Sequence, residues 1–270
     1  MKQLIPLLFL LMLVSCERQT LIQENSNVLA LGSGGMGITN LYPMNSYESI
    51  LQCLNLGADG TEIDVQMTKD SVLVAFHDDD LSASTEMEGA INSYTWAELN
   101  DLSYNAGPYT DFGLVRLDTL FGKLDNLEEY IFSFDCKLIA APGNYDPFIR
   151  AYVRQIVELV DGFGMEENVL IESGDSYFLE YFKSVKNDYN FYINDPSFET
   201  AITTAKDLGL AGIIMDADNI TAGEIDEAHE KGLYVQVWGT DNKGQNIDAI
   251  NKGPDYIQAN DIKSLVELLD

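Results

Sequence analysis

The sequence predicts an α/β protein, a (β/α)8 TIM barrel with a β-hairpin arm after the second strand, on three observations. The chain has 270 residues, an ordinary length for one barrel domain. Hydrophobic residues make up 46% of the chain, which is enough for a sizeable core. Short apolar runs rich in β-branched and aromatic residues alternate with helical patterns, and this alternation favours parallel strands joined by helical crossovers.

Nine runs along the chain have the character of strands: Val28–Leu31, Thr61–Met67, Val72–His77, Tyr130–Leu138, Val169–Glu172, Asn190–Ile193, Gly212–Asp216, Tyr234–Trp238 and Asp255–Gln258. Helical patterns fall between most of them, as in Ser46–Leu56, Pro147–Phe163, Ser176–Asn187, Thr200–Leu208 and Ala222–Lys231. Only four residues separate Thr61–Met67 from Val72–His77, which suffices for a hairpin but not for a parallel crossover. Val72–His77 is therefore predicted to fold back on its neighbour, which leaves eight parallel strands. The excursion Asp78–Thr119 is too long for a bare loop and is expected to contain a short helix at Thr95–Leu99.

The predicted hairpin brings acidic residues close to a histidine. If its turn centres on Lys69–Asp70, Glu62 lies directly opposite His77 on the same face of the arm. A bulge would shift this pairing by one residue but would keep the side chains within reach of each other.

The first sixteen residues are predicted to be a lipoprotein signal peptide. Lys2 supplies a positive start, and the apolar run Ile5–Val14 is too short for a retained membrane span. The run leads into Leu-Val-Ser-Cys, which resembles the bacterial lipobox and predicts lipidation of Cys16; a plain signal peptide with a chance cysteine is the alternative. Residues 17–27 then form a polar tether, and 28–270 form the barrel. We expect a lipid anchor in the membrane and a location in the bacterial cell envelope, facing the periplasm or the outer surface.

The charge of the chain restricts its partners. The formal net charge is -29, and so acidic a surface repels nucleic acid, which is not expected as a partner. The same charge repels phosphate esters. A site for an anionic substrate therefore needs a local cation, either a metal ion or a placed lysine.

Charged residues alternate inside two of the predicted hydrophobic strands. Glu62 and Asp64 share one face of a strand that is otherwise apolar, and Asp135 and Lys137 repeat the pattern on the next barrel strand. Inward carboxylates are costly unless something neutralises them. Solvated residues at the strand ends are one interpretation; the other is a hard divalent cation held by oxygen ligands.

These residues carry a family resemblance. The segment Gly57–Asp70, followed by Phe-His-Asp at 76–78, resembles the glycerophosphodiester phosphodiesterase family. Asp135-Cys136-Lys137 resembles the Glu-x-Lys strand of that family, the loop 43–46 resembles its Pro-Glu-Asn-Thr loop, and 237–242 resembles its late strand end with a tryptophan. The resemblance covers most of the chain after residue 27, and the run from Glu-x-Asp to His-Asp is its specific part.

The resemblance implies hydrolysis of a small-molecule glycerophosphodiester to glycerol phosphate and an alcohol, with a divalent metal, Ca²⁺ or Mg²⁺. Three carboxylates carry over as metal ligands: Glu62, Asp64 and Asp135. Lys137 carries over as the phosphate contact and His77 as the group that transfers a proton. Asn45 of the Pro-Glu-Asn-Thr-like loop is expected to bind the substrate, and Trp238 is expected either to line the pocket or to belong to the core.

The chain departs from the family where the first strand ends. The family has His-Arg-Gly there, whereas this chain has Ser33 at the position of the second catalytic histidine and Gly34 at that of the arginine. Serine cannot act as a general base near neutral pH, and loss of one proton-transfer group costs about 10²–10⁴-fold in rate. The glycine-rich turn could offer backbone N–H groups to the phosphate in place of the arginine. We therefore expect impaired hydrolysis. The alternatives are a catalytically weak barrel lipoprotein that binds phosphodiesters, and phosphodiester cleavage by cyclisation.

Overall fold

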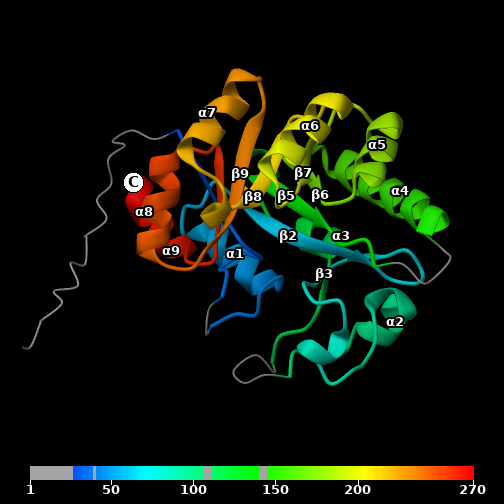
Figure 1. Ribbon diagram of the computed structural model, residues 1–270. Helices are drawn as coiled ribbons and strands as arrows, with labels where there is room; N and C mark the ends of the chain where they lie inside the picture. Colours follow the sequence, from blue (N-terminus) through cyan, green and yellow to red (C-terminus); the bar gives the residue numbers. More distant parts are fainter. Residues whose placement is uncertain (1–26, 39–40, 106–110, 140–144) are drawn as a thin grey trace, which may run out of the picture.

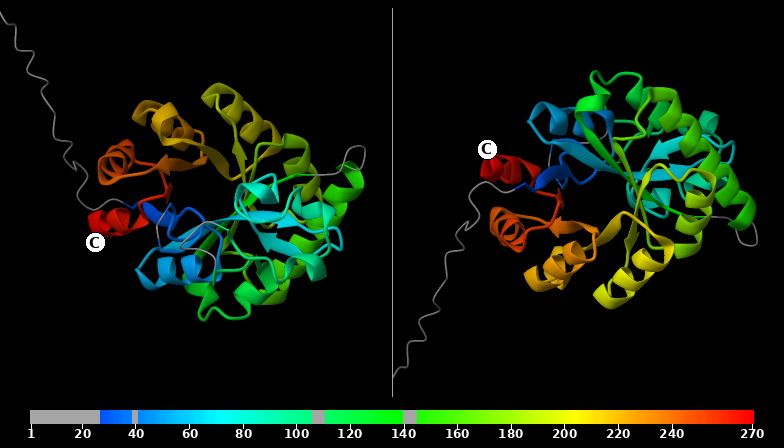
Figure 2. Two further views of the ribbon diagram at one scale, coloured as in Figure 1. Left: turned by 90° about the horizontal axis from the view of Figure 1, so that it is seen from below. Right: turned by 90° about the horizontal axis from the view of Figure 1, so that it is seen from above.

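The computed structural model describes residues 27–38, 41–105, 111–139 and 145–270. Their strands form one sheet that closes on itself, because β1 (Leu29–Gly32) pairs with both β2 (Gly60–Met67) and β10 (Tyr256–Ala259). Eight parallel strands make the barrel and helices surround it, which confirms the predicted (β/α)8 fold (Figure 2). The predicted signal peptide with Cys16, and the tether up to residue 26, lie outside the described residues. Among the described helices, none is both long and apolar enough to cross a bilayer.

Strands and helices alternate along the chain (Figure 1). The other barrel strands are β5 (Ile131–Cys136), β6 (Val169–Ser173), β7 (Asn190–Asn194), β8 (Gly212–Asp216) and β9 (Tyr234–Thr240). The helices around the barrel are α1 (Tyr47–Asn55), α3 (Leu117–Phe121), α4 (Tyr145–Phe163), α5 (Ser176–Val185), α6 (Phe198–Leu208), α7 (Ala222–Glu230), α8 (Lys243–Lys252) and α9 (Ile262–Leu269). Short 3-10 helices occur at η1 (Leu81–Ala83), η2 (Ile91–Ser93), η4 (Leu127–Glu129) and η5 (Ala217–Asn219).

Successive side chains along a strand point to opposite faces of the sheet, so one set packs in the main core and the other set points into the barrel. On β5, Phe132 and Phe134 both pack against Phe121 of α3, in the layer between sheet and helices. The residues between and after them, Ser133 and Asp135, point to the other side, into the barrel. A second, smaller apolar cluster built on Leu170, Tyr192 and Ile214 forms apart from the main core. Polar side chains can therefore occupy the inside of the barrel without disturbing the main core.

The segment between β2 and β5 builds a small lobe beside the barrel (Figure 1). β3 (Leu73–Ala75) runs antiparallel to β2, which confirms the predicted arm, and β4 (Val115–Arg116) adds a further antiparallel strand that the sequence did not reveal. The predicted short helix is α2 (Trp96–Leu99). The lobe has its own apolar cluster, in which Phe76 and Tyr104 contact each other.

The register of the hairpin differs by one residue from the prediction. Val65 pairs with Ala75, so Glu62 does not lie directly opposite His77. The loop causes the difference, because Ser71 adopts a left-handed conformation with φ of 65°. A left-handed residue at the end of a hairpin turn makes a three-residue loop, whereas the prediction assumed a two-residue centre. His77 consequently falls beyond the paired part of the arm.

Candidate active site at the mouth of the barrel

A cavity of about 240 Å³ lies at the C-terminal ends of the barrel strands, the end at which barrel enzymes carry their sites. Every barrel strand contributes to it, either from within the strand or from the residues just after it, and the arm adds a histidine. The lining residues are Ser33, Glu62, Asp64, His77, Asp135, Lys137, Glu172, Asn194, Ile214, Trp238 and Gln258. The structure thus brings together seven of the predicted site residues: Ser33, Glu62, Asp64, His77, Asp135, Lys137 and Trp238.

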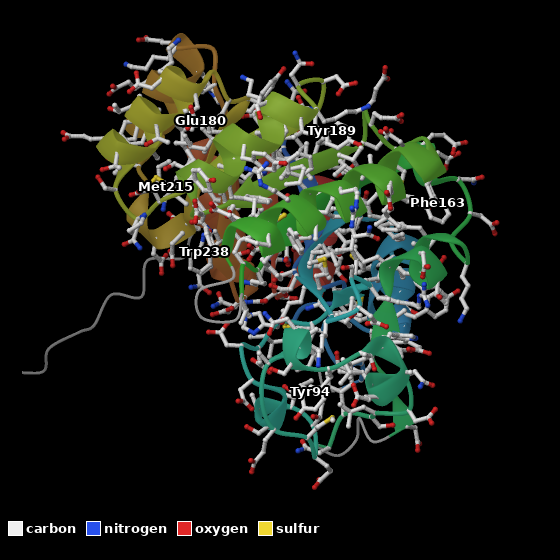
Figure 3. All side chains as sticks on the ribbon, turned by 90° about the vertical axis from the view of Figure 1, so that its right-hand side faces the viewer. Tyr94, Phe163, Glu180, Tyr189, Met215 and Trp238 are labelled. Atoms are coloured by element: carbon white, nitrogen blue, oxygen red, sulfur yellow. The ribbon has the colours of Figure 1, made fainter. Side chains whose placement is uncertain are left out.

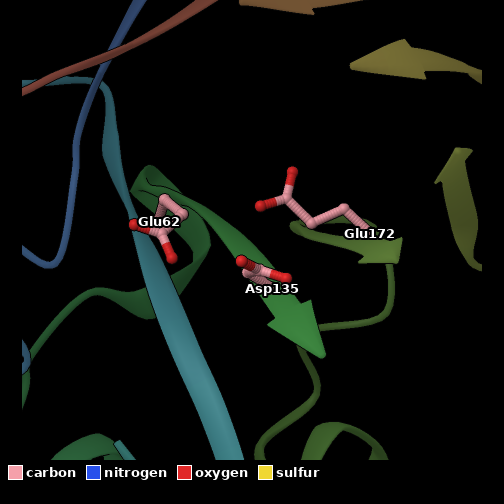
Figure 4. Close-up of side chains that lie close together, drawn as sticks. All are labelled: Glu62, Asp135 and Glu172. Atoms are coloured by element: carbon pink, nitrogen blue, oxygen red, sulfur yellow. The ribbon is translucent and has the colours of Figure 1, made fainter. Parts of the chain in front are cut away.

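Three carboxylates converge in this cavity (Figure 4). Glu62, Asp135 and Glu172 each offer one oxygen, and these oxygens all lie within 4.8 Å of one another. They come from the neighbouring strands β2, β5 and β6. Sequence reasoning missed Glu172, because it is a single charged residue at the end of the apolar run Val169–Ile171, without the alternation of charges seen at Glu62 and Asp135.

Asp64 lies in the same cavity but has other partners. Its Oδ1 is 2.9 Å from Lys137 Nζ, and Lys137 Nζ also donates to Asp135 Oδ2 at 2.5 Å. Asn45 donates from Nδ2 to Asp64 Oδ2 at 2.7 Å, and the Asp64 backbone N–H donates to Asn45 Oδ1 at 3.0 Å. Because Asn45 is fully buried, it holds Asp64 in place and does not line the cavity. The prediction that Asn45 contacts the substrate is therefore wrong.

The backbone N–H groups of the glycine-rich turn after β1 donate hydrogen bonds to side chains of β2. The Gly34 N–H donates to Glu62 Oε2 at 2.9 Å, and the Gly35 N–H donates to Thr61 Oγ1 at 3.0 Å. The prediction that this turn, Gly34 included, presents N–H groups to a phosphate is therefore wrong: the turn braces Glu62 instead. The Ser33 side chain does reach the cavity, and its hydroxyl is 3.4 Å from Glu62 Oε2.

Asp78 and Gln66 position His77, while its side chain stays exposed. Its side chain is 59% exposed, and Nδ1 lies 3.0 Å from Asp78 Oδ1. Asp78 Oδ2 in turn accepts a hydrogen bond from the Ser84 hydroxyl. The buried Gln66 donates from Nε2 to the carbonyl oxygens of Phe76 and Asp78, at 2.9 and 2.8 Å, and so fixes the backbone on both sides of the histidine. Sequence reasoning missed Gln66 and Ser84, since neither carries a motif of its own.

Trp238 is 39% exposed and lines the cavity, so of its two predicted placements the structure supports the pocket. It lies on the side of the barrel that faces the lobe containing Tyr94 (Figure 3).

The electrostatics of the cavity favour a bound cation. Burial raises the pKa of Glu62 well above its usual range, and the charges of Asp64 and Glu172 raise it further. Burial raises the pKa of Glu172 to about 8, with the charge of Asp135 adding to the rise. Burial opposes the charge on Lys137, but the two aspartates beside it outweigh this effect and its pKa is raised. The cavity therefore contains four carboxylates, those of Glu62, Asp64, Asp135 and Glu172, and only Lys137 among its lining lysines and arginines to offset their negative charge.

The carboxylates fit a hard divalent ion. Oε1 of Glu62 is buried, and no hydrogen bond from the described residues reaches it. A buried carboxylate oxygen without a partner is costly unless a cation neutralises it. Carboxylate oxygens are also the ligands that Ca²⁺ and Mg²⁺ prefer. With both features, this cluster could hold a divalent metal ion.

The raised pKa of Glu172 predicts that the metal-free protein loses stability as the pH rises. The folded-state pKa of about 8 exceeds the usual value for glutamate, so folding favours the protonated form. The stabilisation is complete at low pH and is lost as the pH rises through the folded-state pKa. We expect the melting temperature in chelator to fall between about pH 5 and pH 8.5, and to fall less in Glu172→Gln. Parallel curves for the two proteins would contradict the assignment.

A closed barrel with converging carboxylates, a lysine and a histidine at its mouth defines a barrel enzyme suited to phosphate esters. Residues 36–268 match the family model described as Glycerophosphoryl diester phosphodiesterase family, and the chain belongs to this family. The matched stretch begins at Met36, three residues after Ser33.

Relatives and solved structures agree with this assignment. The chain is 24% identical over 238 residues to the glycerophosphodiester phosphodiesterase of Caldanaerobacter subterraneus subsp. tengcongensis, covering 84% of this chain and 92% of that protein. A glycerophosphodiester phosphodiesterase structure from Parabacteroides distasonis has a TM-score of 0.77 at 21% identity, covering 91% and 98% of the two chains. An Oleispira antarctica phosphodiesterase in complex with the product sn-glycerol-3-phosphate has a TM-score of 0.78 at 18% identity, covering 90% and 96%. At these identities the structures show the shared fold.

Proposed function

We propose that the chain hydrolyses glycerophosphodiesters to glycerol phosphate and an alcohol with the help of a divalent ion, Ca²⁺ or Mg²⁺. One observation carries the proposal: the buried Glu62 Oε1 has no partner among the described residues and lies in a cluster of carboxylates beside Lys137. Family membership supports the reaction. The Oleispira relative, which was solved with sn-glycerol-3-phosphate as product, supports the substrate class.

The residues that line the cavity have different proposed roles. Glu62, Asp64 and Asp135 are the proposed ligands, and a bound ion would offset the charge of the phosphoryl oxygens. Lys137, whose Nζ lies between two aspartates at the mouth, would bind a phosphate oxygen.

His77 would move the proton of the leaving alcohol, with Asp78 orienting its ring. Trp238 would pack against substrate carbon. The His77 ring also borders a second cavity of about 260 Å³, whose lining includes Met44, Phe76 and Tyr104. This apolar lining favours an alcohol with an apolar portion.

We propose that the unmodified chain turns over glycerophosphodiesters slowly. The sequence has two histidines, and His229 pairs with Asp255 at 3.0 Å outside the cavity. His77 therefore has no second imidazole to share the two proton transfers, and Ser33 cannot replace one. The same observation favours a second candidate function, a barrel that binds phosphodiesters and turns them over slowly.

We also propose that the protein is located in the bacterial cell envelope. The Leu-Val-Ser-Cys motif ending at Cys16 supports lipidation of that cysteine after export. The barrel would then be tethered by residues 17–27 to a membrane of the bacterial cell envelope.

A panel of glycerophosphodiesters tests the proposed function. The protein is incubated with each substrate in Ca²⁺, in Mg²⁺ and in chelator, and release of glycerol phosphate is measured. We expect slow release that stops in chelator and returns when metal is added back. Turnover that chelation leaves unchanged would contradict the role of the metal, and no release from any substrate would contradict the reaction.

A further inference from the structure

Glu172 stands at the level of the proposed metal ligands. In the sheet register, Asp64 pairs with Asp135, and Asp135 pairs with Glu172. Three carboxylates therefore follow one another across β2, β5 and β6. Glu172 is only 2% exposed, and a buried carboxylate at the end of an apolar strand is unfavourable unless it is neutralised.

Hydrogen bonds from the barrel interior fix the carboxylate of Glu172. Its Oε2 accepts from Gln258 Nε2 at 2.9 Å and lies 3.2 Å from Ser133 Oγ. Gln236 Oε1 lies next to both groups, 3.1 Å from Gln258 Nε2 and 3.3 Å from Ser133 Oγ, whose single proton serves one acceptor at a time. These residues come from β5, β9 and β10, and together they hold Glu172 at one oxygen. This is how polar groups behind a metal site orient its ligands.

Glu62 is held in the same way from the opposite side of the cluster. Its Oε2 accepts from the Gly34 N–H, whereas its Oε1 is buried without a partner. Both glutamates are thus anchored through one oxygen, and Figure 4 shows the side chains of Glu62, Asp135 and Glu172 close together inside the barrel. Glu62 therefore has a buried oxygen without a partner and lies in a cluster with two further carboxylates, a combination that a bound cation would explain.

We propose that Glu172 is a direct ligand of the divalent ion, together with Glu62 and Asp135, and that Ser133 and Gln258 orient it. This inference rests on the proposed function for the presence of the ion and adds a ligand that the sequence motif did not contain. Ca²⁺ binds oxygens at about 2.3–2.6 Å, so two oxygens on one ion lie within about 5 Å of each other. The separation of at most 4.8 Å among the three oxygens meets this limit.

Asp64 differs from Glu172 in its surroundings. Both Asp64 oxygens already have partners, Oδ1 in Lys137 and Oδ2 in Asn45. Asp64 stays a proposed ligand, but its charge is already partly offset by Lys137, so replacing it should weaken ion binding less than replacing Glu172.

Calorimetry with Ca²⁺ alone on the full chain, freed of metal beforehand, tests the proposal. Loss of an outer-shell partner alone costs about 10–100-fold in metal affinity, so Glu172→Gln should weaken Ca²⁺ binding at least about tenfold. Asp64→Asn should weaken it less. Glu230→Gln is the matched control, because it removes one charge from an exposed site just ahead of β9, at the opposite end of the barrel, and should leave the affinity unchanged.

The melting temperature of the metal-free variants separates a ligand from a structural residue. If Glu172 is a ligand, Glu172→Gln keeps or raises the metal-free melting temperature and loses the stabilisation by Ca²⁺. Should that variant fold poorly, Glu172→Asp retains the charge, shortens the side chain and should show a partial loss of affinity.

Two outcomes would overturn the inference, and they are distinguishable. If the unmodified chain binds Ca²⁺ and Glu172→Gln binds it equally well, Glu172 belongs only to the polar network and the proposed function stands. If the unmodified chain binds neither Ca²⁺ nor Mg²⁺, the metal role in the proposed function fails and the inference fails with it.

Discussion

Ser33→His should raise kcat for glycerophosphodiester hydrolysis by about 10²–10⁴-fold, the usual worth of a general acid–base group. Ser33 lines the cavity that also contains His77, so an imidazole at this position would face the same substrate. It would supply the second proton transfer that His77 alone cannot serve. KM should change much less, because the metal ion and Lys137 provide most of the attraction for the phosphate in the ground state.

Two further variants show whether the gain has this cause. His77→Ala in the Ser33→His background should remove the gain, since the two histidines act on the same reaction. Ser33→Ala should behave like the unmodified chain, because the serine hydroxyl contributes no proton transfer. If the unmodified chain is already as fast as Ser33→His, Ser33 is not the position of the second acid–base group, and another residue at the barrel mouth does that work.

Glu62→Gln should abolish measurable binding of Ca²⁺ and Mg²⁺ and should lower turnover at least about a hundredfold. The metal is expected to contribute several kcal/mol to the transition state, and each 1.4 kcal/mol is about tenfold in rate. Glutamine has nearly the same shape, and Glu62 is only 4% exposed, so the substitution removes the charge while the packing stays intact. Calorimetry and the turnover assay give the two readouts, with Glu230→Gln as the control.

The metal-free melting temperature of Glu62→Gln should not fall. Burial and the neighbouring carboxylates raise the pKa of Glu62, so its charge is unfavourable in the absence of an ion. Ca²⁺ affinity equal to that of the unmodified chain would contradict the placement of the ion.

The barrel was predictable because its signal is spread over the whole chain. Alternation of strands and helices recurs many times, and the four-residue gap before Val72 identified the arm that does not belong to the barrel. Glu62, Asp64, Asp135 and Lys137 were also predictable, because charges that alternate within an apolar strand must point together into the barrel.

The remainder depended on contacts that the sequence does not encode locally. Glu172 is a single charge at a strand end, and only the register of β6 against β5 places it beside Asp135. Asn45 was mistaken for a substrate contact because its partner Asp64 is 19 residues away in the sequence, on the other side of α1. The hairpin register depended on the left-handed conformation of Ser71, which a non-glycine residue adopts only rarely.

Phosphorus NMR of the protein with glycerophosphodiesters and Ca²⁺ tests the central claim most directly, because substrate, glycerol phosphate and any cyclic phosphate give separate signals in one sample. We predict that the diester signal decays slowly and is replaced by glycerol phosphate without a cyclic product. The conversion should be faster in Ser33→His and should stop in chelator. A cyclic phosphate as the product, or no conversion by either protein above the rate without protein, would contradict metal-dependent hydrolysis of glycerophosphodiesters by this chain.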